Sequence, residues 1–182
     1  MKKFLLLFII VSISICNAQK LTATPAGFVD LADATKTFLV IQAEGKTPKQ
    51  LYENAIKFIN TNYKSPDETI KSKSEGQFLK FETTAPDFMY FTNGVKIFVT
   101  AKYTTELYFK DGKAKYEITA LEMHTTADNK PVTFTAGSFD WSIFSPKGVV
   151  KKESAKADLE KYFNGQVALI ANYLQGKVED KW

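Results

Sequence analysis

Hydrophobic and polar residues alternate most regularly in the middle of the chain, between Val95 and Lys110. The hydrophobic positions are Val95, Ile97, Val99, Ala101, Tyr103, Leu107 and Phe109. A period of two over this length predicts a strand with one face buried and the other in water. Asp111-Gly112 follows directly and is typical of a two-residue hairpin turn, which requires positive φ angles. The pattern therefore predicts a long β-hairpin.

The same alternation predicts the register of this hairpin. If Lys110 pairs with Lys113, the hydrophobic residues of the two strands meet on one face. The expected pairs are Phe109 with Ala114, Leu107 with Tyr116, Thr105 with Ile118, and Tyr103 with Ala120. A slip of one residue would move the hydrophobic residues of the second strand to the wet face. Beyond Ala120 the alternation changes phase, so we expect a β-bulge near Ala120 and Leu121 that returns Leu121 and Met123 to the core.

Further strands are expected on the N-terminal side of this hairpin. Residues 37–42 are a continuous hydrophobic run with β-branched members, which suits a buried strand. Residues 70–74 and 78–83 flank a Glu75-Gly76 turn and indicate two more strands.

Two helices complete the pattern. The first begins at Thr47-Pro48, a capping residue followed by proline at the first helical position, and ends at Ser65-Pro66. Its hydrophobic stripe is Leu51, Tyr52, Ala55, Ile56, Phe58, Ile59 and Tyr63. The second helix covers 155–178, with a stripe of Leu159, Tyr162, Phe163, Val167, Leu169, Ile170, Tyr173 and Leu174. The order β-α-β-β-β-β-α predicts an α+β fold in which an antiparallel sheet carries both helices on one face.

Two aromatic segments follow neither period. One is Phe88-Met89-Tyr90-Phe91, and the other lies in the long connection 125–154. We expect both in loops, where they either pack against the ends of the sheet and helices or form an exposed patch for a partner or an apolar ligand. The candidate binding residues are Phe88, Tyr90, Phe91, Phe139, Trp141 and Phe144.

The N-terminus has the pattern of a secretory signal peptide. Two lysines precede a hydrophobic stretch over 4–15, and Ala18 closes a cleavage site of small residues. Lipid attachment to Cys16 is the competing interpretation, but the bulky residue before this cysteine fits it less well. Cleavage after Ala18 would place the protein outside the cytoplasm, in the periplasm or secreted, with a lead-in segment over 19–36 and a single domain over 37–182.

Composition narrows the possible chemistry. All 24 basic residues of the 182-residue chain are lysines, and the mature chain would keep 22 of them against 20 acidic residues. It contains no lysine-rich run of the kind that binds nucleic acid or anionic lipid. It also lacks a cysteine for a disulfide, a thiolate nucleophile or a metal site. Motifs of phosphate-binding loops, nucleophile elbows, zinc proteases and EF-hands are absent from the sequence.

Three ionisable residues come closest to a catalytic or metal site. His124 is the single histidine, but it has no local acidic cluster, and we expect a solvated position at a strand end. Glu106 and Glu117 should face each other on the wet side of the hairpin, with Lys102 and Lys115 nearby. Carboxylates opposed in this way are closer than glycoside hydrolysis normally requires. We therefore expect no enzymatic activity, no bound metal and no cofactor.

Two segments resemble a known family. Residues 52–59 (YENAIKFI) with 63–66 (YKSP) are similar to its first helix and the exit from that helix, and residues 107–116 (LYFKDGKAKY) are similar to its hairpin. The family is an uncharacterised domain of unknown function in exported Bacteroidetes proteins, and the resemblance, over about 37–124, implies a fold like that of the TATA-binding protein (TBP-like). Lys113 stands where the family usually has arginine. The resemblance supplies no catalytic residue, and the DNA binding of the fold's namesake does not extend to an exported chain without arginine.

Two functions remain open from the sequence. The first is a non-enzymatic binding module that contacts a protein or another component of the cell envelope, without spanning the membrane and without binding nucleic acid. The second is a carrier that holds a small apolar molecule between the curved sheet and the C-terminal helix. A cavity above about 300 Å³ beneath that helix would favour the carrier. A filled core with Trp141 and Phe144 exposed would favour the binding module.

Overall fold

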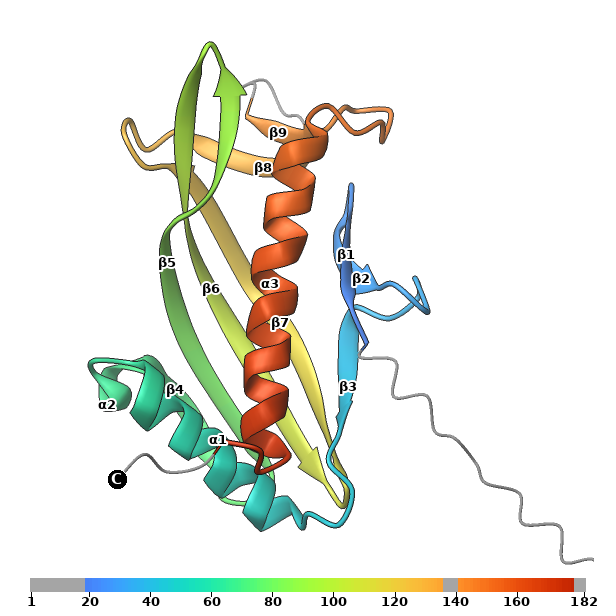
Figure 1. Cartoon of the computed structure of the whole chain (residues 1–182), viewed down its shortest axis with the longest axis vertical. Coiled ribbons are helices and arrows are strands. Elements are labelled where there is room, and N and C mark those ends of the chain that lie inside the picture. The colour runs from blue at the N-terminus through green and yellow to red at the C-terminus, as the bar shows by residue number, and fades with distance from the viewer. Residues whose placement is uncertain (1–18, 136–140, 179–182) are drawn as a thin grey trace, which may run out of the picture.

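The long alternating segment forms the central hairpin of the sheet (Figure 1). In the computed structural model, which describes residues 19–135 and 141–178, β6 (Val95–Lys110) and β7 (Lys113–Thr125) are antiparallel and turn at Asp111-Gly112. Gly112 has a φ angle of +69°, which the tight turn needs and which glycine adopts without strain. The expected pairs nearest the turn are confirmed: Phe109 with Ala114, Leu107 with Tyr116, and Thr105 with Ile118.

The β-bulge lies at Thr119, slightly earlier than expected. Thr104, and not Tyr103, pairs with Ala120. The extra residue is thus a threonine on the wet face, where its hydroxyl donates to Glu106 (3.2 Å). The residues that the bulge returns toward the core are Leu121, half-buried, and Met123, fully buried. The phase change in the alternation therefore indicated a real bulge.

Five more strands extend this hairpin into a seven-stranded sheet. They are β3 (Phe38–Gln42), β4 (Ile70–Ser74), β5 (Phe78–Asn93), β8 (Pro131–Thr135) and β9 (Ser142–Phe144). The strand order is β4-β5-β6-β7-β8-β9, and β3 pairs with the start of β7. All pairs are antiparallel except β8 with β9, which is parallel. The long connection 125–154 therefore contributes two short strands to the sheet.

Three helices accompany the sheet: α1 (Pro48–Asn62), α2 (Pro66–Thr69) and α3 (Glu153–Leu174). The Thr47 hydroxyl accepts a hydrogen bond from the Gln50 N–H (3.3 Å), and the Gln50 side chain accepts one from the Thr47 N–H (2.9 Å). This capping box confirms the expected start of α1. The short α2 follows Ser65, and α3 ends before Gly176, which has a φ angle of +70°. None of the described helices is long and hydrophobic enough to cross a membrane.

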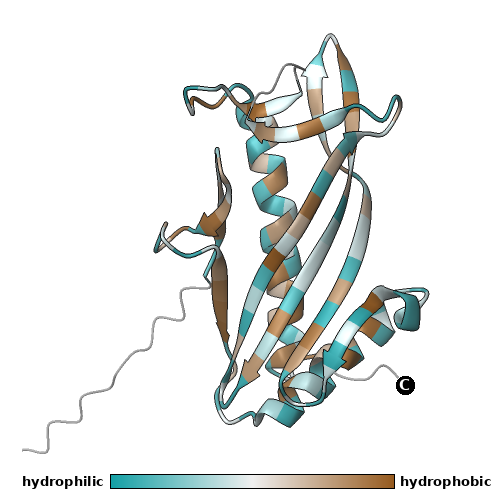
Figure 2. Ribbon diagram, turned by 180° about the vertical axis from the view of Figure 1, so that it is seen from behind, coloured by the Kyte–Doolittle hydropathy of each residue, from teal (hydrophilic) through white to brown (hydrophobic). Residues whose placement is uncertain are grey.

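The long helix covers one face of the sheet, and the opposite face is open (Figures 1 and 2). The buried side chains of β6 confirm the predicted alternation: Val99, Ala101, Tyr103, Leu107 and Phe109. Val95 departs from it, because this residue is 68% exposed. It lies beside the turn between β5 and β6, which projects beyond the part of the sheet that α3 covers (Figure 1).

Residues 19–36, expected as a lead-in segment, form a hairpin that packs on α3. Its strands are β1 (Leu21–Thr24) and β2 (Gly27–Asp30). The Asn164 side chain accepts from the Leu21 N–H (2.8 Å) and donates to the Leu21 carbonyl (2.9 Å), as a neighbouring strand would. Glu160 accepts from the Ala23 N–H (2.8 Å). The N-terminal segment is therefore part of the packed structure.

Candidate functional site

The first aromatic segment, residues 88–91, lies in β5 and not in the expected loop. Its missing periodicity has a local cause, because three residues of β5 stand opposite one residue of β6 between Ala85 and Met89. Asp87 adopts a positive φ angle of 51° within this bulge, a conformation that aspartate tolerates better than most residues. As a result, Phe88 and Met89 both pack toward α3 although they are neighbours in the chain.

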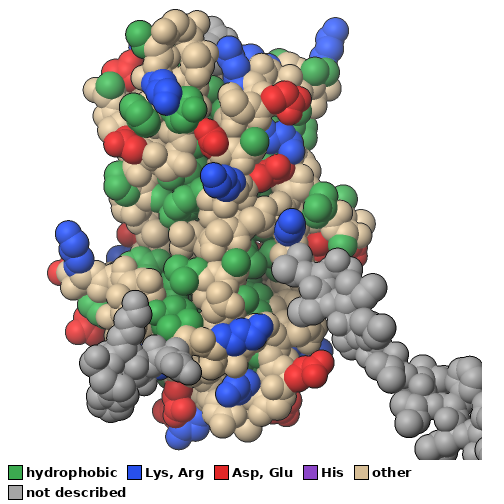
Figure 3. Space-filling model, in the orientation of Figure 1, with side chains coloured by type: hydrophobic (Ala, Val, Ile, Leu, Met, Phe, Trp, Pro, Cys, Tyr) green, Lys and Arg blue, Asp and Glu red, His purple; other side chains and the backbone are tan. Residues whose placement is uncertain are grey.

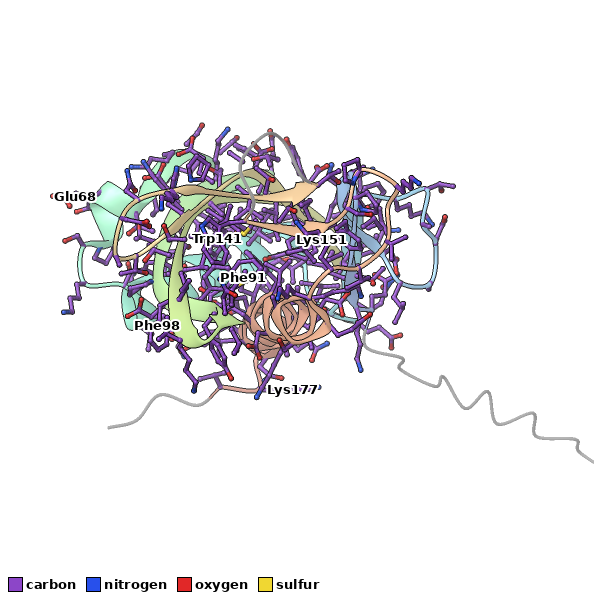
Figure 4. All side chains as sticks on the ribbon, turned by 90° about the horizontal axis from the view of Figure 1, so that it is seen from above. Glu68, Phe91, Phe98, Trp141, Lys151 and Lys177 are labelled. Carbon is purple, nitrogen blue, oxygen red and sulfur yellow. The ribbon has the colours of Figure 1, made fainter. Side chains whose placement is uncertain are left out.

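Most of the predicted binding residues belong to the core. Phe91 and Phe144 are 1% and 3% exposed, and Trp141 packs on Phe91 with ring centroids 5.4 Å apart (Figure 4). Phe88 is half-buried against Tyr162 of α3, at 5.1 Å between ring centroids. The predicted positions that lie outside the described residues are Phe139 and the signal peptide with Cys16. The aromatic residues that the structure describes here mainly fill the core, so they offer little surface to a partner.

Tyr90 points the other way, to the outer face of the hairpin that β5 and β6 form. Its ring centroid lies 6.0 Å from that of Phe98, and the Lys96 ammonium lies 4.4 Å from the Tyr90 centroid. Phe98 is 44% exposed and points outward in Figure 4. Neither Phe98 nor the exposed Val95 is among the binding residues expected from the sequence. Phe98 does carry a signal, because it is a bulky hydrophobic residue at a position that the alternation assigns to the wet face.

A further exposed hydrophobic residue, Val149, lies in the connection 145–152 between β9 and α3, at the same end of the molecule (Figure 1). The exposed basic residues of this connection are Lys147, Lys151 and Lys152. Its backbone is held by bonds from the Ser145 N–H to the Val149 carbonyl and from the Lys151 N–H to the Ile143 carbonyl, both 2.8 Å. The turn therefore holds Val149 at the surface, away from the core.

We use the name apical surface for two segments, the end of the hairpin that β5 and β6 form (the first loop) and the connection 145–152 (the second loop). It comprises Tyr90, Val95, Lys96, Phe98, Lys147, Val149, Lys151 and Lys152. Three of the five strongly exposed large hydrophobic residues in the described part of the chain belong to it. The sequence has no acidic residue between Asp87 and Glu106, or from Trp141 to Lys152. Figure 3 shows lysine and hydrophobic side chains next to each other at this end, with acidic side chains between them. The residues of the apical surface themselves are hydrophobic and basic.

The open face of the sheet carries the two opposed glutamates. Glu106 pairs with Glu117 across β6 and β7, as expected. The Lys80 ammonium lies 3.0 Å from Glu106 and that of Lys115 lies 2.6 Å from Glu117, whereas Lys102 pairs with a different glutamate. Burial raises the pKa of Glu106, but hydrogen bonds from Lys80 and neighbouring hydroxyls outweigh this effect and keep the pKa below its usual value. A general acid needs a raised pKa, so Glu106 does not suit acid catalysis.

His124 lies near the end of β7, opposite Thr100 and Pro131. It is half-buried, not fully solvated. Within residues 19–135 and 141–178, groups of three or more side chains able to hold a metal do not occur. His124 is therefore a strand residue that has no set of metal-ligating neighbours among these residues.

Two solved structures share this arrangement of sheet and helices. A DUF4468 family protein from Bacteroides ovatus has a TM-score of 0.57 at 11% sequence identity, over 79% of this chain and 87% of that one. A TBP-like protein from Parabacteroides distasonis has a TM-score of 0.52 at 12% identity, over 76% of this chain and 90% of that one. The fold is TBP-like. This confirms the fold that the hairpin and helix segments implied, together with the likeness to Bacteroidetes proteins of unknown function.

At the sequence level, no protein-family model matches the chain, and no curated protein is significantly similar to it. At 11% and 12% identity, the TBP-like neighbours show the fold alone. Any function must therefore be argued from the side chains of this chain.

Proposed function

We propose that this TBP-like protein is an exported, non-enzymatic binding module that docks on a component of the cell envelope through its apical surface. The observation that carries the proposal is that Val95, Phe98 and Val149 are exposed together with lysines on two segments at one end of the fold (Figure 1). Large hydrophobic side chains that cluster at a surface typically mark an interaction site. Export is inferred from the signal-peptide pattern of residues 1–18.

The carrier function receives less support from the packing of α3. The stripe on this helix is buried: Leu159, Phe163, Val167, Ile170 and Leu174. Its unusual width has another explanation, because α3 packs on α1 and on the N-terminal hairpin as well as on the sheet. The Phe58 ring of α1 lies 5.5 Å from that of Tyr173, and the Phe28 ring of β2 lies 4.7 Å from that of Phe163.

An open depression of about 410 Å³ does exist, but it lies at the Asp111-Gly112 turn. Its lining comes from this turn and from residues 44–47, outside the interface between the sheet and α3. A binding module was expected to expose Trp141 and Phe144, but Phe144 is buried and Trp141 is half-buried. The apical surface takes the place of these aromatic residues in the proposal.

Sedimentation with envelope membranes from the producing cells tests the proposed function. We expect the mature protein to sediment with the membranes and the double variant Val95→Asp/Val149→Asp to lose most of this binding. Both valines are exposed, so the variant should fold normally, which circular dichroism would verify. Leu31→Asp is the matched control, because Leu31 is 63% exposed but lies outside the apical surface. Wild-type protein that stays in the supernatant would show the proposed function to be wrong.

A further inference from the structure

We infer that the apical surface binds the surface of an anionic lipid bilayer, with hydrophobic residues in the interfacial region and lysines at the headgroups. The inference rests on the proposed function and names the envelope component that the module contacts. The two loops combine the features that place a peripheral protein on a membrane: exposed hydrophobic side chains and an excess of basic charge.

The hydrophobic residues are placed at the outermost points of the two loops. Val95 directly follows Gly94 at the turn between β5 and β6 and is 68% exposed. Val149 follows Gly148 in the turn of residues 145–152 and is 64% exposed. Phe98 adds an aromatic ring, 44% exposed, on the outer side of the first loop. Side chains in these positions enter the headgroup layer without any rearrangement of the core.

Lysines accompany the hydrophobic residues on both loops. The Lys96 ammonium lies 4.4 Å from the Tyr90 centroid, so an aromatic ring and a cation are presented together. On the second loop Lys147 and Lys152 are exposed, and Lys151 donates to the Ser142 hydroxyl (3.2 Å). Each lysine near an anionic membrane strengthens binding roughly fivefold.

The acidic residues that adjoin these loops are engaged elsewhere or stand at a helix start. Asp87 accepts a hydrogen bond from the Thr126 hydroxyl (2.7 Å), and Asp128 pairs with Lys130 (2.7 Å). Glu153 begins α3, where a carboxylate interacts favourably with the helix dipole. Asp87 and Glu153 keep their negative charges, but the apical surface carries four lysines, so positive charge is in excess among the described residues here.

A bilayer fits this surface better than a folded protein does. Protein interfaces concentrate their binding energy in tryptophan, tyrosine and arginine within a central, well-packed patch. The apical surface instead presents two separate tips, each with an exposed valine, and its two aromatic rings, Tyr90 and Phe98, lie on the outer side of the first loop and not in a central patch.

The two loops lie far apart in the sequence, and for this reason the sequence contains no basic run that would indicate this surface. Lys96 and Lys147 come from segments that lie far apart along the chain, and each segment has few charges of its own. The fold brings both segments to one end of the molecule (Figure 1). The absence of a lysine-rich run therefore does not argue against anionic lipid as the ligand.

Vesicles of defined composition test the inference directly. We expect the mature protein to sediment with vesicles of phosphatidylcholine and phosphatidylglycerol, and to bind pure phosphatidylcholine roughly tenfold less or weaker still. Raised salt should weaken binding to the anionic vesicles, because it screens the lysines. Equal binding to both vesicle types, or no binding to the anionic type, would overturn the inference.

Paired variants separate the contribution of the hydrophobic residues to vesicle binding from that of the lysines. Val95→Asp/Val149→Asp should abolish vesicle binding, with Leu31→Asp as its control. Lys96→Gln/Lys147→Gln should reduce vesicle binding at least tenfold. The control Lys110→Gln/Lys113→Gln removes two exposed lysines beside the turn between β6 and β7 and should have little effect on binding. Equal losses in both lysine pairs would show that net charge, and not the apical surface, determines binding.

The vesicle and envelope experiments fail in different ways. Binding to envelope membranes without binding to anionic vesicles would overturn the lipid inference and leave the proposed function in place, with another component as the partner. Absence of binding in both experiments would contradict the proposed function itself.

Discussion

Thr105 Oγ1 and Tyr116 Oη are buried in the core without a hydrogen bond to any described residue. Burial raises the pKa of Tyr116, and the Thr105 hydroxyl opposes part of this rise, although the two groups do not meet in hydrogen-bonding geometry. Tyr103 is buried nearby, but its hydroxyl shares a hydrogen bond with that of Tyr162 (3.1 Å). The two core tyrosines therefore differ in what their hydroxyls contribute to stability.

Removal of each hydroxyl should separate these two cases. Tyr116→Phe removes an unsatisfied polar group and should leave the free energy of unfolding unchanged or raise it by about 1 kcal/mol. Tyr103→Phe, the matched control, removes a hydrogen bond and should lower it by about 1 kcal/mol. Urea unfolding of both variants measures the difference. A larger loss of stability for Tyr116→Phe than for Tyr103→Phe would contradict the assignment.

At the scale of elements, one carboxylate ties the N-terminal hairpin to α3. Glu160 accepts hydrogen bonds from the Thr22 hydroxyl (2.8 Å), the Ala23 N–H (2.8 Å) and the Lys156 ammonium (2.6 Å). Burial raises the pKa of Glu160, but these three donors outweigh it and hold the pKa below the ordinary value of 4.5. The charged form of Glu160 therefore stabilises the attachment of β1.

This lowered pKa predicts how stability depends on pH. Above pH 4.5 Glu160 is charged in both the folded and the unfolded chain, and its contribution to stability is complete. As the pH falls from 4.5 toward the lower folded pKa, the unfolded chain takes up the proton first and this contribution is lost. Glu160→Gln should reduce stability at pH 7 and narrow its difference from wild type in acid.

Urea unfolding across the acidic range measures this effect. Glu53→Gln, at an exposed glutamate of α1, is the control and should keep the wild-type acid dependence. Amide exchange of Leu21 and Ala23 provides a local readout, because opening of the hairpin should accelerate it in the Glu160 variant. An unchanged difference between Glu160→Gln and wild type from pH 7 to pH 3 would contradict the argument.

On the scale of the whole molecule, surface character changes along the long axis. The apical end joins hydrophobic tips with lysines, whereas much of the charge on the open sheet face is neutralised in ion pairs, such as Lys80 with Glu106 between neighbouring strands and Lys115 with Glu117 within β7. A molecule that stands with its apical end on a membrane would leave this open face in solvent (Figures 1 and 2).

Export can be tested on the intact protein. We expect the mature chain to begin at Gln19, because the hydrophobic stretch over 4–15 and the small residue Ala18 match a cleaved signal peptide. Intact-mass measurement of the protein recovered from envelope and culture fractions would identify this end. A mature chain that begins at a lipid-modified Cys16 would replace cleavage after Ala18 with lipoprotein anchoring, and an uncleaved cytoplasmic chain would contradict export.

The sequence predicted much of the fold because its strongest signals are local. The Asp111-Gly112 turn and the alternation before it determine the hairpin register through backbone geometry and one-sided burial. Thr47 and Pro48 start α1 through interactions within a single turn. The candidate site was predicted less well, because the bulge around Asp87 breaks the period of β5 and makes residues 88–91 resemble a loop.

By itself, the sequence determined the central hairpin, its register near the turn and the start of α1, since each depends on neighbours along the chain. The TBP-like fold followed from the resemblance to a family, and the sequence did not indicate β1, β2, β8 and β9. Only the tertiary structure decided which hydrophobic residues remain exposed. Phe91 and Phe144 are covered by elements distant in sequence, whereas Val95 and Val149 stand on loops that no other described element covers. Solvent exposure depends on the packing of the whole chain, and for that reason the apical surface is a property of the fold and not of any one segment.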